Sequence, residues 1–345
     1  MKLHQKAQKS FRRDYIMLFV SNEGNHDPAI NLALEEYIFR QLPENNYLLF
    51  YINEPSIIIG KNQNTVEEIN AEYVKENHIH IVRRMSGGGA VYHDLGNLNF
   101  SFIMKDDGSS FHNFKKFTEP VVDALRTMGI EAELTGRNDI QIGEKKISGN
   151  AQFHSRGKII SHGTLLFNSE MQNVASALKV NAEKYASKST KSVRSRVANI
   201  TEFLQEPMTI EQFRLKILHS IFAGEGEVQS YVLTEEDWKK VRQLADERYR
   251  SWEWTYGRSP QFNMQQRKRI EGAGTFDVRL NVQDGIIQDA AIYGDFFGRG
   301  DRNEVAEQLI GLRYTEEELS KHVDNIDLAF YFGPISKEDW MSLLL

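Results

Sequence analysis

Two arginines stand directly before three consecutive glycines in RRMSGGGAVYHD, at residues 83–94. Glycine lacks a Cβ atom and reaches positive φ at little cost, so a run of glycines lets main-chain N–H groups come close to a ligand. Clustered N–H groups bind phosphates or carboxylates, and Arg83 and Arg84 can donate charge-assisted hydrogen bonds to the same anion. A flexible hairpin loop with solvated arginines explains this stretch equally well, because a glycine-rich loop alone is a weak signal.

Two lysines lie in a second polar stretch, GRNDIQIGEKKISGNA at residues 136–151. A lysine near a glycine loop suits a phosphate, because its ammonium is a point charge on a flexible stem that can follow charge as it moves between oxygens. Lys145 and Lys146 are neighbours in a predicted strand, so their side chains point to opposite faces and only one can reach a common site. Simple solvent exposure is the alternative for each lysine.

Three other residues are candidates for the same site. Asp139 is a possible Mg²⁺ ligand, although a carboxylate also suits a turn or the end of a strand. His162 lies in a third stretch, SHGTLLF at 161–167, and His93 follows the glycines. Each histidine taken singly also fits a structural role.

The composition is that of an ordinary globular protein. With 345 residues, of which 40% are hydrophobic and 26% charged, the chain is long enough for one large domain and a smaller one. A formal net charge of −6 argues against a protein that binds nucleic acid or an anionic membrane over its whole surface. The apolar run YIMLFV at 15–20 is too short for a signal-peptide core or a membrane span. We therefore expect a cytoplasmic protein with neither nucleic acid nor membrane as a partner.

The sequence contains no cysteine. This fits a reducing compartment without requiring one. The chemical consequence is definite, because no thiolate nucleophile, acyl-thioester intermediate or cysteine-zinc site is available.

Residues 15–167 alternate helices with antiparallel strand pairs, which predicts an α+β fold. A helix is expected over residues 27–39, where Asp27 can act as the cap and Pro28 suits the first turn. A second helix is expected over 113–129, where apolar residues recur every three or four positions. Alternating patterns and turn residues predict strands at 47–52, 56–60, 79–84, 90–93, 98–104, 131–136, 138–143, 145–153 and 158–167.

The second half of the chain begins with helices and ends in a smaller unit. Helices are expected over 209–222, with a capping box between Thr209 and Gln212, and over 235–249. The stretch SWEWTYGRSPQFN at 251–263 is typical of a junction. Strands and then helices follow it. We predict a large domain over 15–250 and a small α+β domain over 255–345.

A basic segment lies between these halves, at residues 181–199. It holds five cations and one acid, separated by serines and threonines. Such a run is usually a solvated loop. The alternative is a mobile flap that closes over an anionic ligand or partner.

The three polar stretches, in this order and spacing, closely resemble those of the lipoate-protein ligase A family. That family shares its fold with biotin-protein ligases and with lipoyl or octanoyl transferases. The likeness extends from NLALEEYIF at 31–39 through TKSVRSRVANIT at 190–201 to WEWTYGRSPQF at 252–262. It covers most of residues 15–260, and the small C-terminal domain also suits such a ligase.

The resemblance implies an α+β fold with a large mixed or antiparallel sheet in the ligase domain and a small α+β accessory domain. It implies that free lipoate, or octanoate, reacts with ATP and Mg²⁺ to form an acyl-AMP, and that the acyl group then passes to one lysine of a lipoyl-carrier domain. Such acceptors are the acyltransferase subunits of 2-oxoacid dehydrogenases and the glycine-cleavage H protein. A monomer that takes part in lipoate salvage is expected.

Carried over by motif, the resemblance also implies a set of site residues. Lys146 is the catalytic lysine, and Asp139 stays the candidate Mg²⁺ ligand. The residues expected to bind ATP or lipoyl-AMP are Arg84, Ser86, Gly87, Gly88, Gly89, Ala90, Val91, Tyr92, Asn138, Lys146, Ser148 and Gly149. Those expected to bind lipoate are Gly88, His93, Lys146 and His162. The loop expected to cover the adenylate contains Lys184, Lys188, Arg194 and Arg196.

Three alternatives are distinguished by single features of the sequence. An amidotransferase of this fold would carry the acyl group on a cysteine, which the chain lacks. A biotin-protein ligase would be expected to have an arginine-rich GRGR-type loop in place of SGGGAV. A non-catalytic paralogue that binds lipoate or lipoyl-AMP as a carrier or sensor would be expected to lose the lysine, and Lys146 is present.

Overall fold

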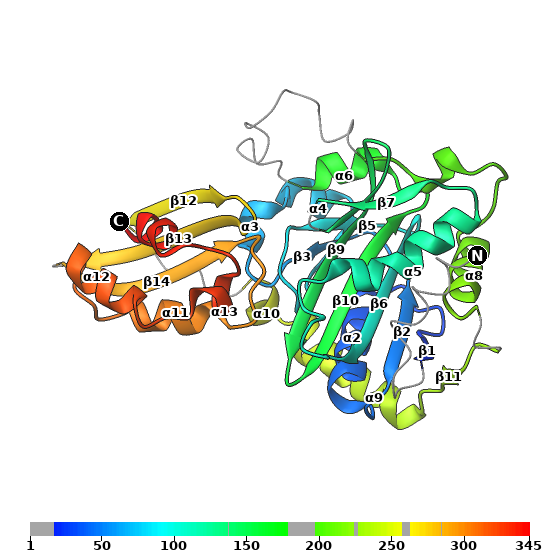
Figure 1. Cartoon of the computed structure of the whole chain (residues 1–345), viewed down its shortest axis with the longest axis horizontal. Coiled ribbons are helices and arrows are strands. Elements are labelled where there is room, and N and C mark those ends of the chain that lie inside the picture. The colour runs from blue at the N-terminus through cyan, green and yellow to red at the C-terminus, as the bar shows by residue number, and fades with distance from the viewer. Residues whose placement is uncertain (1–16, 137, 179–196, 224–226, 257–262, 284) are drawn as a thin grey trace. The chain divides into compact units, whose positions relative to one another are not determined.

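The computed structural model describes residues 17–136, 138–178, 197–223, 227–256, 263–283 and 285–345. It divides into two compact units. Unit 1 contains the chain up to Ile58, Ile69–Val82 and Val91–Ser251, and unit 2 contains Ile59–Glu68, Arg83–Ala90 and Trp252–Leu345. Two short internal segments therefore belong with the C-terminal residues. Figure 1 labels the helices and strands along the chain.

An eight-stranded mixed sheet is the centre of unit 1, with the order β11-β1-β2-β6-β10-β9-β8-β7. The strands are β1 (Met17–Ser21), β2 (Asn46–Tyr51), β6 (Asn97–Lys105), β7 (Ala132–Thr135), β8 (Asp139–Ile142), β9 (Lys145–Ser155), β10 (Lys158–Leu166) and β11 (Ser230–Tyr231). β1 pairs in parallel with both β2 and β11, whereas β2, β6, β10, β9, β8 and β7 pair antiparallel. A smaller sheet has the order β4-β3-β5, from β3 (Ser56–Ile59), β4 (His80–Arg83) and β5 (Val91–His93).

The apolar core of unit 1 lies on one face of the large sheet. Alternate residues of β6, from Leu98 to Met104, pack there with α5 (Phe114–Thr127) and α8 (Ile210–Ile221). Such alternation is the expected result of a strand with two different faces. Helices α5 and α8 begin and end close to the predicted positions, and the capping box between Thr209 and Gln212 is confirmed.

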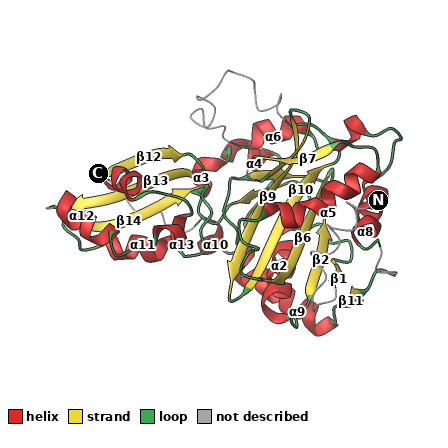
Figure 2. Ribbon diagram, in the orientation of Figure 1, coloured by secondary structure: helices red, strands yellow, loops and turns green. Residues whose placement is uncertain are grey.

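The opposite face of the sheet is covered by α2 (Pro28–Gln41), which packs on β6 and β10 and against α9 (Glu235–Leu244) (Figure 2). Asp27 caps α2 by accepting hydrogen bonds from the N–H groups of Ala29 and Ile30, as predicted. The expected helix over 235–249 is correct in extent, but its last five residues, Ala245–Tyr249, form a π-helix. Unlike an amphipathic surface helix, α2 buries Asn31, Glu35 and Glu36 together with its apolar residues.

The short helices of unit 1 are α4 (Ala71–Glu76), α6 (Met171–Ala177) and the 3₁₀ turn Ile200–Phe203. Among the described residues, no helix is both long and apolar enough to cross a bilayer.

Unit 2 is built around the antiparallel sheet β12-β13-β14, from β12 (Met264–Ile270), β13 (Gly274–Gln283) and β14 (Ile286–Gly294). Helices α11 (Arg302–Leu309), α12 (Glu316–Val323), α13 (Leu328–Phe332) and α14 (Lys337–Leu344) pack with it. Stacked and edge-on aromatic rings fill this core, in which Phe276 stacks on Phe296 at 4.6 Å and Phe332 stacks on Trp340 at 4.4 Å. The same unit contains α3 (Thr65–Glu68) and α10 (Trp252–Thr255).

Candidate active site

The predicted site residues fall in both units. Arg84, Ser86 and the residues through Ala90 belong to unit 2, and the others that are described belong to unit 1. The four predicted cations of the covering loop, Lys184, Lys188, Arg194 and Arg196, lie outside the described residues.

Lys146 forms an ion pair with Asp139, and 2.8 Å separate its Nζ from the carboxylate oxygen. Asp139 begins β8, Lys146 lies near the start of β9, and the two strands pair antiparallel with an irregularity after Ile140. Asp139 pairs in register with Gly149, and the Lys146 side chain lies over Gly149, with Nζ 3.2 Å from where a Cβ atom would be. The side chains of Lys146 and Asp139 are 36% and 31% exposed, so a ligand can reach both.

The residues around Gly149 hold this hairpin by polar contacts. Gly149 donates its N–H to Thr164 Oγ1 at 3.2 Å. Asn138 and Asn150 each donate a side-chain N–H to the main-chain carbonyl of the other, at 2.6 and 3.0 Å. Ser148 is fully buried and accepts from the Asn150 side chain at 3.2 Å. The predicted nucleotide-binding residues Asn138, Ser148 and Gly149 therefore lie in or directly beside the β8–β9 hairpin that carries Lys146.

His162 lies on β10, on the face of the sheet that α2 covers, opposite Ser101 of β6 and Ala151 of β9. Its Nδ1 atom is 2.9 and 3.1 Å from the two carboxylate oxygens of Glu35. Because a carboxylate only accepts, Nδ1 carries the proton. Both residues are buried, at 8% and 1% exposed, so the carboxylate fixes the orientation of the ring.

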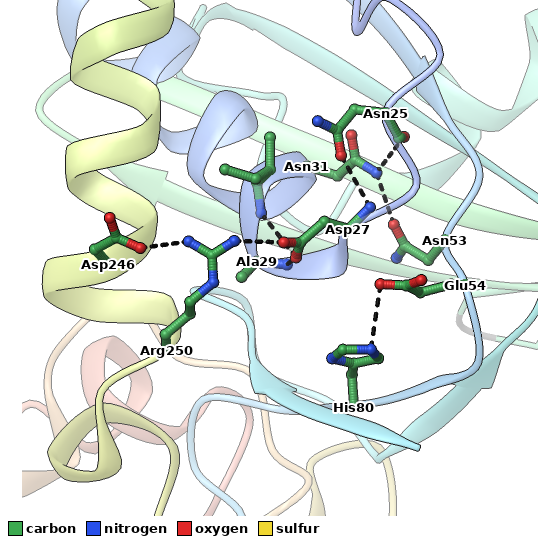
Figure 3. A network of polar contacts seen from close by, with 10 residues as sticks. Asn25, Asp27, Ala29, Asn31, Asn53, Glu54, His80, Asp246 and Arg250 are labelled. Carbon is green, nitrogen blue, oxygen red and sulfur yellow. Dashed lines mark hydrogen bonds and ion pairs between the residues drawn. The ribbon is translucent and has the colours of Figure 1, made fainter. Parts of the chain in front are cut away.

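His93 ends β5 and is also buried. Asn53 donates its side-chain N–H to His93 Nδ1 at 3.0 Å, and Asn31 donates to Asn53 Oδ1 at 2.9 Å. Figure 3 shows Asn31 between Asn25 and Asn53 at the start of α2. Asn31 and Glu35 are four residues apart on this helix, so one face of α2 orients both predicted lipoate-binding histidines.

Sequence reasoning missed Asn31 and Glu35. The available signal was a polar residue and a glutamate within an otherwise apolar face of the predicted helix, in NLALEEYIF. Glu36 has a different task, because it accepts hydrogen bonds from Arg40, Arg248 and Tyr249 and so ties α2 to the π-helix.

The glycine run is packed against other residues of unit 2. A Cβ atom on Gly87 would be 2.4 Å from the carbonyl oxygen of Phe296, and one on Gly88 would be 2.9 Å from the ring of Phe297. Gly88 also has a φ of +91°. Arg84 donates to the carbonyl oxygens of Gly87 and Gly89 at 2.7 and 2.9 Å. The need for glycine here is thus explained in part by the chain's own packing.

Arg84 and Ser86 hold the run together. Arg84 Nε donates to Ser86 Oγ at 2.9 Å, and both side chains are buried. The predicted contact of Arg84 with a nucleotide stays a prediction. Ala90 and Val91 continue the chain into β5, where Val91 pairs with Ile58.

Tyr92 pairs with Ile57 in the smaller sheet. Burial, together with the nearby charge of Asp94, raises the pKa of Tyr92 to about 12. The phenol is therefore neutral at physiological pH and able to donate a hydrogen bond.

The carboxylate of Asp139 is a suitable oxygen ligand for Mg²⁺. Within the described residues, no group of three or more histidine, cysteine, aspartate or glutamate side chains is arranged to hold a metal. An Mg²⁺ ion that arrives with a nucleotide needs only one or two protein carboxylates, because phosphates and water supply its other ligands.

Two family models match the chain. Residues 27–222 match the lipoyl protein ligase A/B catalytic domain, and residues 259–344 match the bacterial lipoate protein ligase C-terminus. The lipoate-protein ligase LplJ of Bacillus subtilis is 57% identical over 331 residues, which cover 95% of this chain and 100% of that protein. The chain belongs to the lipoate-protein ligase family.

Solved structures agree with the fold. The LipL1 protein of P. falciparum, in complex with lipoate, has a TM-score of 0.74 at 24% identity and covers 90% of this chain and 95% of its own. A lipoate-protein ligase A bound with ATP has a TM-score of 0.61 at 31% identity, and the match covers 71% of this chain and 99% of that one. The predicted fold, a large mixed-sheet ligase domain with a small α+β C-terminal domain, is confirmed.

Proposed function

We propose that this enzyme activates lipoate with ATP to lipoyl-AMP and transfers the lipoyl group to a lysine of a lipoyl-carrier domain. The observation that carries the proposal is the partly exposed ion pair of Lys146 and Asp139, 2.8 Å apart, in a chain of the lipoate-protein ligase family. A lysine at this position can follow the charge that develops on phosphate and carbonyl oxygens in both steps.

In the first step, a lipoate oxygen bonds to the α-phosphorus of ATP and the bond to pyrophosphate breaks. The negative charge that gathers there needs fixed donors, and Lys146 and the N–H groups of the glycine run are the proposed ones. Asp139 is the proposed carboxylate ligand for an Mg²⁺ ion that enters with ATP, and such an ion would supply positive charge beside the leaving pyrophosphate.

In the second step, the acceptor amine bonds to the acyl carbon of lipoyl-AMP and AMP leaves with the electrons of the anhydride bond. The amine loses its proton to solvent. No nucleophile of the enzyme is required, which agrees with a chain that has no cysteine.

The acyl chain needs a site of its own, and His93, His162 and Gly88 are its proposed residues. His162 is held by Glu35 of α2, and His93 is held by Asn53, which Asn31 of α2 holds in turn, so the positions of both rings are set before a ligand binds. Such preorganisation lowers the entropic cost of binding.

Further proposals follow from the same function. Octanoate is a second acyl substrate. Acyltransferase subunits of 2-oxoacid dehydrogenases and the glycine-cleavage H protein are the acceptors, and the loop with Lys184 and Arg196 covers the adenylate. We also propose a cytoplasmic monomer that salvages lipoate, with a catalytic domain over 15–250 and an accessory domain over 255–345. A biotin-type ligase and a non-catalytic paralogue are not favoured, because the family models and the relatives are lipoate ligases.

The experiment uses the purified full-length chain with ATP, Mg²⁺, lipoate and an unmodified lipoyl domain. Mass spectrometry should find one lysine of the acceptor carrying a lipoyl group, and only when ATP is present. Biotin with a biotin-carrier domain is the parallel reaction. Modification of that domain, or none of the lipoyl domain, would contradict the proposed function.

A further inference from the structure

Arg83 is a buried arginine whose guanidinium donates hydrogen bonds to uncharged oxygens. It ends β4 and is 6% exposed. Its guanidinium donates six hydrogen bonds, and none of the six acceptors is a carboxylate. The acceptors are the carbonyl oxygens of Gly60, Lys61, Gln63, Trp254 and Thr255 and the hydroxyl of Thr65, at 2.7 to 3.0 Å.

These acceptors belong to two segments that are far apart in the sequence. One is the turn after β3, at 60–65, and the other is α10, at the start of the junction to the C-terminal residues. The contact with α10 runs in both directions, because Trp254 Nε1 donates to the carbonyl oxygen of Arg83 at 2.8 Å. The Thr65 hydroxyl also donates to the carbonyl oxygen of Thr255. A closed set of hydrogen bonds thus joins β4, the turn and α10.

The next residue, Arg84, bonds to the glycine run instead. The two neighbouring arginines therefore have different structural roles. Arg84 stabilises the conformation of the glycine run, and Arg83 attaches the start of the run to the turn and to α10. The turn at 60–65 packs directly on the glycine run, and its first residue must be glycine, since a Cβ atom on Gly60 would be 1.9 Å from the carbonyl oxygen of Gly88. A shift of the turn or of α10 would therefore move the glycine run.

We propose that Arg83 is a positioning residue which, together with Trp254, couples α10 to the glycine run and so sets the affinity of the enzyme for ATP. The inference rests on the proposed function of that run in nucleotide binding. On this inference, the junction influences adenylation through the glycine run, without contacting a substrate itself.

The charge of Arg83 supports this assignment. Burial and the nearby charge of Arg302 lower the pKa of Arg83 to about 9, which still leaves it charged at neutral pH. A buried cation that has only neutral acceptors favours an anion nearby. The phosphates of a nucleotide at the adjacent run are such an anion.

The gentlest test replaces Trp254 by phenylalanine. This removes the indole N–H that donates to Arg83 and keeps an aromatic ring. Trp252→Phe is the matched control, because Trp252 lies in the same helix and is 54% exposed. The loss of one hydrogen bond at a positioned group should raise the KM for ATP about fivefold in Trp254→Phe, with less than a twofold change in the control. The KM for the acceptor domain should stay within twofold.

Thr65→Val tests the same coupling from the other segment. If both contacts act through Arg83, the effects of Thr65→Val and Trp254→Phe on the KM for ATP should be non-additive in the double variant. Arg83→Lys should retain part of the affinity for ATP that Arg83→Met loses, because lysine keeps the charge without the fork of donors.

The outcomes are separable. If the wild type does not lipoylate its acceptor, the proposed function fails. If the wild type is active and Trp254→Phe matches Trp252→Phe in the KM for ATP, the inference is wrong. It is also wrong if Trp254→Phe lowers kcat and thermal stability but leaves the KM for ATP unchanged, since that pattern indicates a purely structural role.

Discussion

Replacement of Lys146 by methionine should separate catalysis from stability. Methionine keeps an unbranched apolar stem that can lie over Gly149, and it removes only the charge. The ion pair that is lost joins two side chains that are 36% and 31% exposed, and such a pair contributes at most about 1 kcal/mol to the free energy of unfolding. Asp139 is exposed enough to be hydrated after the change. We therefore expect a nearly unchanged urea midpoint.

The catalytic effect should be much larger. Removing one donor that stabilises transition-state charge typically costs about 10²- to 10³-fold in rate, which corresponds to roughly 3 to 4 kcal/mol. Because Lys146 is proposed to act in both steps, two assays are needed. One follows pyrophosphate release with lipoate and ATP, and the other follows transfer to the acceptor from preformed lipoyl-AMP. Both rates should fall at least a hundredfold.

Lys145→Met is the control, since Lys145 precedes Lys146 on the same strand. It should retain activity within about threefold, because a neighbouring strand residue points to the other face. If Lys145→Met were the inactive variant and Lys146→Met near wild type, the assignment of the lysine would be refuted. A fall in stability of several kcal/mol in Lys146→Met would refute the reasoning about the ion pair.

Two other substitutions test the surroundings of the site, and a third tests an exposed ion pair of unit 1. Glu35→Gln should lower the free energy of unfolding by about 2 kcal/mol, measured by urea denaturation, because the buried histidine loses a charged acceptor, and it should raise the KM for lipoate. Gly88→Ala should lower the free energy of unfolding by about 1 to 3 kcal/mol, because φ is +91° and a Cβ atom would meet the Phe297 ring at 2.9 Å. Asp107→Asn should lower the free energy of unfolding by at most about 1 kcal/mol at pH 7, since the hydrogen bond from Lys116 holds the pKa of the Asp107 carboxyl below its usual range.

The pH dependence of the last variant has a definite sign. A lowered carboxyl pKa in the folded state stabilises the fold above the unfolded pKa of about 3.9, and this contribution is lost as pH falls through the folded value. The difference between wild type and Asp107→Asn should therefore shrink below about pH 4. A difference in the free energy of unfolding that is constant from pH 7 to pH 3 would contradict this role of the Asp107 carboxylate. Wild-type stability in Gly88→Ala, or in Glu35→Gln, would show that the packing or the buried pair is less important than we infer.

Much of the local structure could be predicted from the sequence, because helix caps, turns and strand alternation depend on residues a few positions apart. Asp27 and Pro28 indicate the start of α2, and the glycine turn SRGK predicts the hairpin between β9 and β10. The π-helix at Ala245–Tyr249 could not be predicted in this way. It has the same apolar pattern as the helix it continues.

The site was predicted as a set of residues, and their partners were not. His162 and Glu35 are 127 positions apart, and nothing in their local sequences specifies the pairing. Register decides it: His162 lies opposite Ser101 and Ala151 on the sheet face that α2 covers, which brings it within reach of a helix far away in the chain.

The sequence by itself determined the chemistry that is available: a glycine run beside arginines, a lysine before Ser148 and Gly149, and the absence of any cysteine. Only the tertiary structure decided which acceptors each of the two arginines binds. Arg83 and Arg84 are equivalent in the sequence, and each could face an anion. The fold buries both, and the alternation of side chains sends Arg83 to the oxygens of residues 60–65 and 254–255 and Arg84 to those of the glycine run. A buried guanidinium must find acceptors for its N–H groups, and two of those that Arg83 finds, the carbonyl oxygens of Trp254 and Thr255, are 171 and 172 positions away in the sequence.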